Sequence, residues 1–205
     1  YFMSTTETNA TIRYTDNGTA PTLASPAYLN PNTITQTKVI KAITYSNDPT
    51  ILPSFMEFAT YFINVNHTLP VVSISATQLN NLANGAGNLE PKGSFEYFDT
   101  AGVRKANTYG EFNRHGQDSW VLSQRSLDFI SRDEMGYNHS VEEKLFEYSP
   151  RQDFQRLILR AAGDDNYPAD HRQANEGSCH VRDAYIHLLS KKGGMNAAMK
   201  NMMPF

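Results

Sequence analysis

Short runs of alternating hydrophobic and polar residues, separated by turn-forming residues, fill the first 65 positions of the chain. Successive side chains of a strand point to opposite faces, so the alternation predicts β-strands. The predicted strands are residues 10–15, 38–45 and 58–63. Five prolines lie between these runs, where a missing N–H removes no hydrogen bond from a sheet. The pattern therefore predicts a small all-β sandwich.

The pattern changes near Leu69, where further strands are followed by a helix. The predicted strands are residues 69–75, 93–98, 103–112, 126–130 and 154–160, with a short helix or loop over 76–88. A helix is predicted over 177–189, because apolar residues recur there at helical spacing and Ser178 is a suitable N-cap. Gly193, which follows two lysines, predicts the end of this helix. Mixed strands followed by a helix indicate an α+β fold for this part.

Composition limits the kinds of protein that the chain can be. A length of 205 residues suits one large domain or two modest ones. The net charge of −3 predicts no nucleic-acid partner, because such proteins need a basic surface to replace counterions. No apolar run approaches the roughly 20 residues of a membrane-spanning helix, so no membrane span is expected. The single cysteine excludes an internal disulfide framework.

Residues 11–22 (TIRYTDNGTAPT) and 25–28 (SPAY) combine strand and turn residues in a distinctive order. This order resembles the signature of the C-terminal-type domain of chitobiases and β-hexosaminidases, and the resemblance extends over residues 4–64. It implies an immunoglobulin-like accessory module of larger bacterial secreted proteins. It implies no glycosidase chemistry, since such a module has no catalytic carboxylates of its own.

Five segments of the second half carry further motifs: LPVVSIS (69–75), SFEYFD (94–99), HGQDSWVLSQRSL (115–127), LILRAAGDDN (157–166) and VRDA (181–184). In this order they resemble the motifs of the CotH-kinase family of secreted and spore-coat kinases. The resemblance implies an α+β, atypical-kinase-like domain that is incomplete at its C-terminus. The expected organisation is a β-sandwich over 1–65, a linker over 66–69 and the N-terminal portion of the kinase-like domain over 70–205.

The second resemblance also implies a chemistry. Active members of the family use ATP with a divalent metal, so ATP with Mg is the expected cofactor of the parent protein. Its catalytic and metal-binding residues are expected beyond Phe205, and no metal ligand is assigned within the chain. The resemblance further implies secretion or a place on the bacterial cell surface, with other domains of the same polypeptide as partners.

Three residues are candidates for binding the nucleotide phosphates or for anchoring the loop that binds them. Arg125 occupies the position of the family's loop lysine, Ser119 matches the family's serine, and Asp183 lies in the VRDA segment. A loop with exposed backbone N–H groups and a fixed cation can hold phosphate. Arginine is, however, bulkier than lysine and planar. Trp120 also stands where the family often has an arginine, and both departures argue against kinase activity.

The candidates also have simpler structural interpretations. Arg125 could form an ion pair with Asp128 or Glu111 at the edge of a strand. Asp183 lies four residues before His187, so it could belong to an ion pair on the surface of the helix.

Two functions therefore remain open. The first is a secreted kinase-like enzyme that phosphorylates a protein substrate, with the β-sandwich as a spacer or substrate-binding module. The second is a non-catalytic surface, matrix or adhesion protein that uses the kinase-like scaffold and the β-sandwich for assembly or for contact with a surface glycan.

Overall fold

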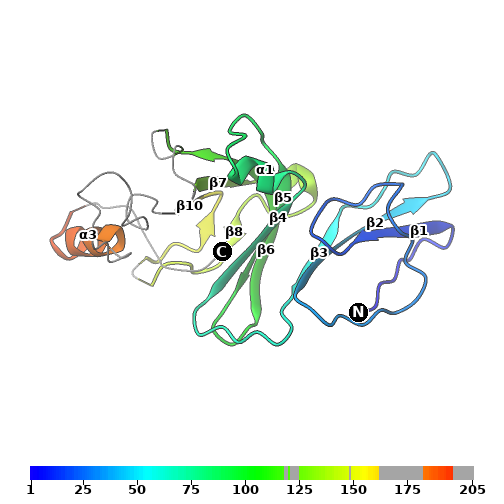
Figure 1. The fold of residues 1–205 in the computed structure, drawn as a ribbon, viewed down its shortest axis with the longest axis horizontal. Coiled ribbons are helices and arrows are strands. Elements are labelled where there is room, and N and C mark those ends of the chain that lie inside the picture. The colour runs from blue at the N-terminus through cyan, green and yellow to red at the C-terminus, as the bar shows by residue number, and fades with distance from the viewer. Residues whose placement is uncertain (118–119, 121–124, 148, 162–181, 196–205) are drawn as a thin grey trace.

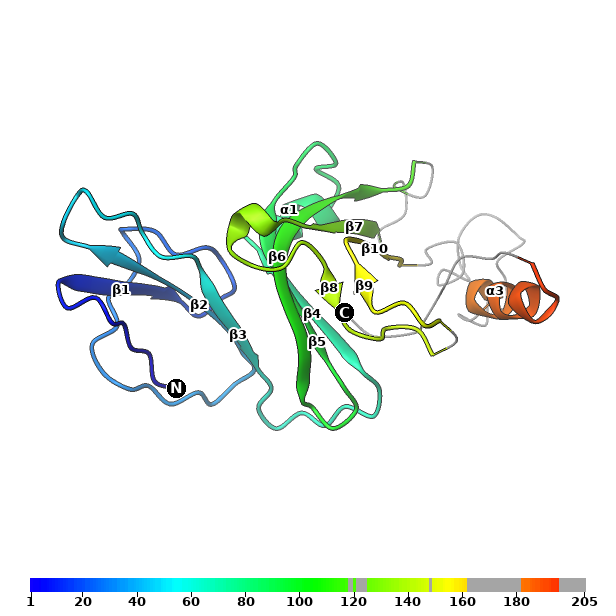
Figure 2. The same cartoon turned by 180° about the vertical axis from the view of Figure 1, so that it is seen from behind.

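The computed structural model describes residues 1–117, 120, 125–147, 149–161 and 182–195. Within them the strands form one three-stranded, one five-stranded and one two-stranded sheet. Figure 1 shows the three-stranded sheet at one end of the molecule and the five-stranded sheet in the middle, and Figure 2 shows the same arrangement from behind. The described part of the chain is therefore mostly β-sheet.

The N-terminal module, residues 1–61, is built on an antiparallel sheet in the order β1-β2-β3. Its strands are β1 (Ala10–Thr15), β2 (Lys38–Ser46) and β3 (Glu57–Tyr61). The alternation of the sequence predicted all three strands, with end positions that agree within two residues. The turn-forming residues that separate the first two strands include Gly18, which has a φ of +76°, a conformation that glycine adopts without steric cost.

A cluster of tyrosines packs against this sheet. The ring of Tyr14, from β1, lies with its centroid 6.2 Å from those of Tyr1 and Tyr28, and Tyr1 also lies 6.4 Å from Tyr61 of β3. An isolated bridge to Ala27 ties the segment that carries Tyr28 to β1. The connection between β1 and β2 thus extends the edge of this sheet beside β1 through backbone hydrogen bonds.

The second module, residues 71–161, is built on an antiparallel sheet in the order β10-β7-β6-β5-β4. Its strands are β4 (Val71–Ala76), β5 (Lys92–Phe98), β6 (Arg104–His115), β7 (Ser126–Ser131) and β10 (Arg156–Leu159). The smaller elements are α1 (Leu79–Ala83), the 3-10 turn η2 (Asp133–Met135) and the strand pair β8 (Val141–Glu142) and β9 (Asp153–Phe154). The five strands of this sheet were predicted, whereas β8 was not, and the single strand predicted over 154–160 is divided between β9 and β10.

The last described helix is α3 (Arg182–Lys192). Its end is as predicted, because Lys191 and Lys192 lie in the last turn and Gly194 follows with a φ of +78°. Three of the apolar side chains that predicted the helix are exposed, those of Tyr185 (60%), Leu188 (37%) and Leu189 (51%). Neither α3 nor the other described helices are long and apolar enough to cross a membrane. An α+β, kinase-like domain is not shown by these elements and stays a prediction.

One face of the five-stranded sheet carries the aromatic core. The rings of Phe95, Phe112 and Phe129 come from three adjacent strands and are fully buried. Phe129 stacks on Phe95 at 4.9 Å and lies 5.0 Å from Phe112. Leu79 and Leu82 of α1 are buried in the same cluster, so α1 covers this face of the sheet.

The opposite face of the sheet is polar, and the N-terminal module covers part of it. Phe58 of β3 lies 5.9 Å from the ring of Tyr109 on β6 and 5.0 Å from that of Tyr137. A side chain at Gly18 would meet Ser75 of β4, because its Cβ would lie 2.9 Å from the Cβ of Ser75. The two modules are therefore joined by the chain and also pack against each other, with the interface between β2–β3 and β4–β6.

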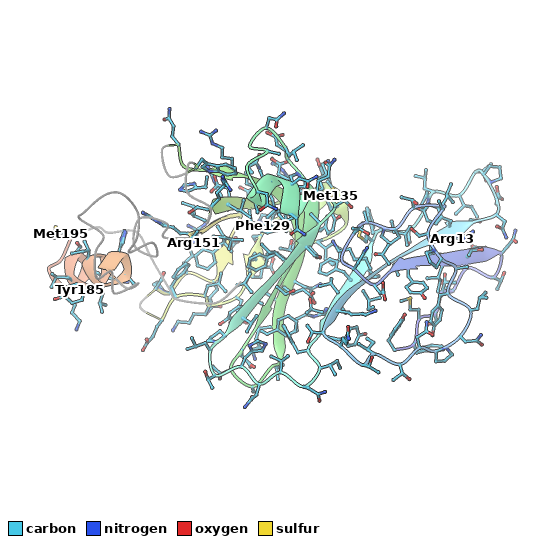
Figure 3. The ribbon with its side chains drawn as sticks, in the orientation of Figure 1. Arg13, Phe129, Met135, Arg151, Tyr185 and Met195 are labelled. Atoms are coloured by element: carbon cyan, nitrogen blue, oxygen red, sulfur yellow. The ribbon has the colours of Figure 1, made fainter. Side chains whose placement is uncertain are left out.

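The core assignment leads to a stability prediction for Phe129, which lies in the middle of the molecule (Figure 3). Phe129→Ala is expected to lower the free energy of unfolding by about 3–5 kcal/mol, because it removes a buried ring with two aromatic neighbours. Urea unfolding followed by circular dichroism would measure this change. Ile158→Ala is the control, since Ile158 on the neighbouring strand is 51% exposed and should cost less than about 1 kcal/mol. Equal losses would contradict the assignment.

Candidate functional site: the loop between β6 and β7

The candidate loop leaves the sheet after β6 and returns to it at β7. Its two ends are held side by side, because His115 and Ser126 are antiparallel partners in the ladder. Gly116 has a φ of +96°, a backbone conformation that favours glycine, and it allows the chain to turn out of β6. The structure describes Gly116, Gln117, Trp120 and Arg125 of this loop.

Trp120 anchors the loop in the core. Its side chain is 9% exposed and belongs to the aromatic cluster. Its indole N–H donates a hydrogen bond of 2.8 Å to the carbonyl of His115. Two guanidinium groups lie near its ring, that of Arg114 at 5.3 Å and that of Arg125 at 5.6 Å from the centroid. The ring of Trp120 thus lies between two arginine side chains, both within the range of cation–π attraction.

Arg125 connects the loop to α1. Its Nε donates to the carbonyl of Trp120 at 3.0 Å, and its Nη1 donates to the carbonyl of Ala83 at 3.1 Å. Ala83 is the last residue of α1, and helices end with carbonyls that lack a partner within the helix. Arg125 therefore satisfies one carbonyl at the end of a helix and one inside its own loop.

The glycine-containing segment after α1 packs on the same two arginines. A Cβ at Gly85 would lie 3.4 Å from Nη2 of Arg125, and a Cβ at Gly87 would lie 2.9 Å from Cδ of Arg114. Gly85 has a φ of +113°, which side chains rarely tolerate. The short segment therefore needs glycines to approach the arginines and Trp120 so closely. Sequence reasoning identified this segment only as a connection, because its contacts are with residues far along the chain.

The two carboxylates considered as partners of Arg125 bind other arginines. Asp128 is buried and accepts a hydrogen bond of 2.6 Å from Nη2 of Arg156, and it lies 3.2 Å from Nδ1 of His115. Glu111 accepts a hydrogen bond of 2.8 Å from Arg132. The contact with Arg132 lowers the pKa of Glu111, and the contact with Asp128 raises the pKa of Arg156.

The other two candidate residues cannot be placed beside Arg125. Ser119 lies outside the described residues. Asp183 lies in the first turn of α3, and the structure does not describe its side chain. Among the described residues, no group of three His, Cys, Asp or Glu side chains could hold a metal ion. The described site is therefore a cationic loop, in which Arg114 and Arg125 flank Trp120 beside a glycine-containing segment.

Comparison with known protein families supports part of the sequence interpretation. The model of the chitobiase/beta-hexosaminidase C-terminal domain family matches residues 1–50. The match covers β1 and β2. It confirms the predicted resemblance over that range and indicates an immunoglobulin-like N-terminal module. No curated protein and no solved structure matches the chain. The resemblance of residues 69–205 to CotH kinases gains no support from these comparisons and stays a prediction.

The contacts of Arg125 lead to a prediction for its conservative replacement. Arg125→Lys is expected to lower the free energy of unfolding by about 1–3 kcal/mol, because an ammonium cannot reproduce the forked bonds to Trp120 and Ala83. Trp120 is the only tryptophan, so its fluorescence emission should also shift to longer wavelength. Urea unfolding and fluorescence spectra would measure both effects.

The matched control for this replacement is Arg114→Lys. Arg114 is exposed and stacks on the same ring, so this change is expected to alter stability by less than about 0.5 kcal/mol. If Arg125→Lys changed neither stability nor emission, the structural role of Arg125 would be refuted.

Proposed function

We propose that the chain is part of a secreted or cell-surface bacterial multidomain protein that contains a CotH-kinase-like domain. The immunoglobulin-like module precedes this domain and packs on it. The activity expected of the parent protein is the transfer of phosphate from ATP to a protein substrate, with Mg as the metal.

The order of the motif segments along one sheet is the observation that supports this proposal most. The segment LPVVSIS includes most of β4, and the segment SFEYFD forms most of β5. The segment from His115 to Leu127 joins β6 to β7, LILR includes most of β10, and Arg182 begins α3. Four of the five motif segments, which are spread over about 90 residues of the sequence, thus include neighbouring strands of a single sheet, as motifs of one domain should.

The described residues fit a nucleotide in one respect and not in another. Phosphoryl transfer requires a cation on the phosphates and carboxylates that hold a metal. Arg114 and Arg125 supply positive charge beside a glycine-containing segment. Among the described residues, no group of three His, Cys, Asp or Glu side chains could hold the metal. ATP with Mg would supply the phosphoryl group, and the role of this chain's own residues would be to attract and orient the phosphates.

Nucleotide binding by the intact protein tests this proposal. Isothermal titration calorimetry with ATP and Mg is expected to show binding, and Arg125→Ala should weaken it at least about tenfold, since bonds to a charged group contribute about 1.5–3 kcal/mol. Arg151→Ala is the matched control, because Arg151 stacks on Phe154 in another part of the module and should not affect binding. Absence of binding in the wild-type protein and in Arg125→Lys would refute the kinase-like function.

A second function, a non-catalytic surface or adhesion protein, is favoured by a specific observation. The guanidinium of Arg125 donates to two backbone carbonyls, so part of its hydrogen-bonding capacity serves the fold. In this case the two packed modules would act as a rigid scaffold for assembly or for glycan contact. Retention of the intact chain on insoluble chitin or another cell-surface polysaccharide, without nucleotide binding, would support this alternative. Failure to bind any glycan or protein would contradict it.

A further inference from the structure

The interface between the two modules contains a fully buried lysine. Lys41 lies in the middle of β2 and is 0% exposed. Its Nζ donates a hydrogen bond of 2.7 Å to the carbonyl of Ser75 on β4 and lies 5.5 Å from the centroid of the Tyr109 ring on β6. Both contacts are with the second module. Separation of the modules would therefore return the side chain of Lys41 to water.

The charged form of Lys41 is poorly compensated in this position. An ammonium has three N–H donors, and Ser75 provides its one hydrogen-bond acceptor among the described residues. No described carboxylate forms a salt bridge with it. Because a buried ammonium without a paired carboxylate is costly, burial lowers the pKa of Lys41 to about 7, although the charge of Glu96 opposes this shift.

Glu96 is buried in the same interface but serves other partners. It is 1% exposed, and Oε1 accepts a hydrogen bond of 2.9 Å from Nη1 of Arg104. It also accepts hydrogen bonds from the backbone N–H and the hydroxyl of Thr60 on β3. Its carboxylate is thus compensated independently of Lys41. A neutral Lys41 can keep its bond to Ser75 without leaving Glu96 unpaired.

We propose that Lys41 makes the docking of the N-terminal module on the second module depend on pH, with the contact weakest near neutral pH and tighter as the pH rises toward 10. In the separated state the lysine would keep its proton up to about pH 10.5, the ordinary range for this side chain. In the docked state it loses its proton near pH 7. Docking therefore releases a proton between these values, and each pH unit in this window favours docking by up to about tenfold.

Other titratable groups at the interface set the upper end of the pH range in which docking becomes tighter. Burial raises the pKa of Tyr109 to about 12 and also raises that of Tyr137, which donates to the carbonyl of Met56 across the interface. Because both phenols resist ionisation when docked, pH values above about 10 should weaken the contact. The other charged groups at this interface are Glu96 of β5 and Arg104 of β6, which form a salt bridge with each other.

Amide hydrogen exchange of the intact chain measures the docking equilibrium directly. Two backbone N–H groups report on the interface, because that of Thr60 donates to Glu96 and that of Ala20 donates to the hydroxyl of Thr77. Their protection factors, corrected for intrinsic exchange, are expected to be constant from pH 6 to 7. They should then rise by up to about tenfold per unit toward pH 10. The amide of Phe112, which donates to Pro91 within the second module, is the internal reference and should not follow this course.

Two variants distinguish the effect of Lys41 on docking from other effects of pH on the protein. Lys41→Met keeps the length of the side chain and cannot be protonated, so the modules should stay docked and the rise should disappear. Lys38→Met is the matched control, because Lys38 lies on the same strand, is partly exposed and pairs with Asp16 within the N-terminal module; it should keep the rise. An unchanged rise in Lys41→Met would overturn the proposal. If Lys41→Met does not fold, the wild-type curve decides alone, and constant protection from pH 7 to 10 would refute the proposal.

Discussion

The arrangement of the two modules depends on the burial of Lys41 and Glu96 between their sheets. Side chains alternate along a strand, so β5 cannot place Phe95 and Tyr97 in the aromatic core without turning Ser94 and Glu96 to the other face. That face is buried as well. Buried polar groups require partners. The hydroxyl of Ser94 pairs with that of Ser75 on β4, while Glu96 accepts hydrogen bonds from Thr60 on β3 of the N-terminal module and from Arg104 of β6. The N-terminal module thus provides hydrogen bonds that a buried carboxylate of the second module requires.

The cationic loop between β6 and β7 is also held in place by contacts between segments that are distant in sequence. Trp120 fills a place in the core and thereby pins the loop between β6 and β7. Arg125 then bonds to the loop and to the last residue of α1, which are far apart in sequence. The positive charge that could attract phosphate is consequently held by contacts that also stabilise the fold. Scaffold and binding functions are compatible at this loop, because a guanidinium has five donors in a fixed fork.

Local sequence patterns were sufficient for most of the fold. The strands β1, β2 and β3 and the five long strands of the second module follow the alternation of apolar and polar residues, since the period of a strand depends on a few consecutive positions. The strands β8 and β9 have two residues each, too few for any period to be visible. The apolar residues of α3 show its helical spacing, but its exposed Tyr185 and Leu189 show that spacing alone does not indicate whether a face is covered.

The sequence by itself determined the strands, the turns at glycines, and the similarity of the first residues to a known accessory domain, because each of these depends on neighbouring positions. Only the tertiary structure decided what the charged residues do. From the sequence, Lys41 is one charged residue within a predicted strand, and Arg125 is a candidate phosphate ligand or a residue at the edge of a strand. Their actual environments are set by Ser75 and Tyr109 in the first case and by Ala83 and Trp120 in the second. The free energy of a charged group depends on its desolvation and on its partners, and both are supplied mainly by segments distant in sequence.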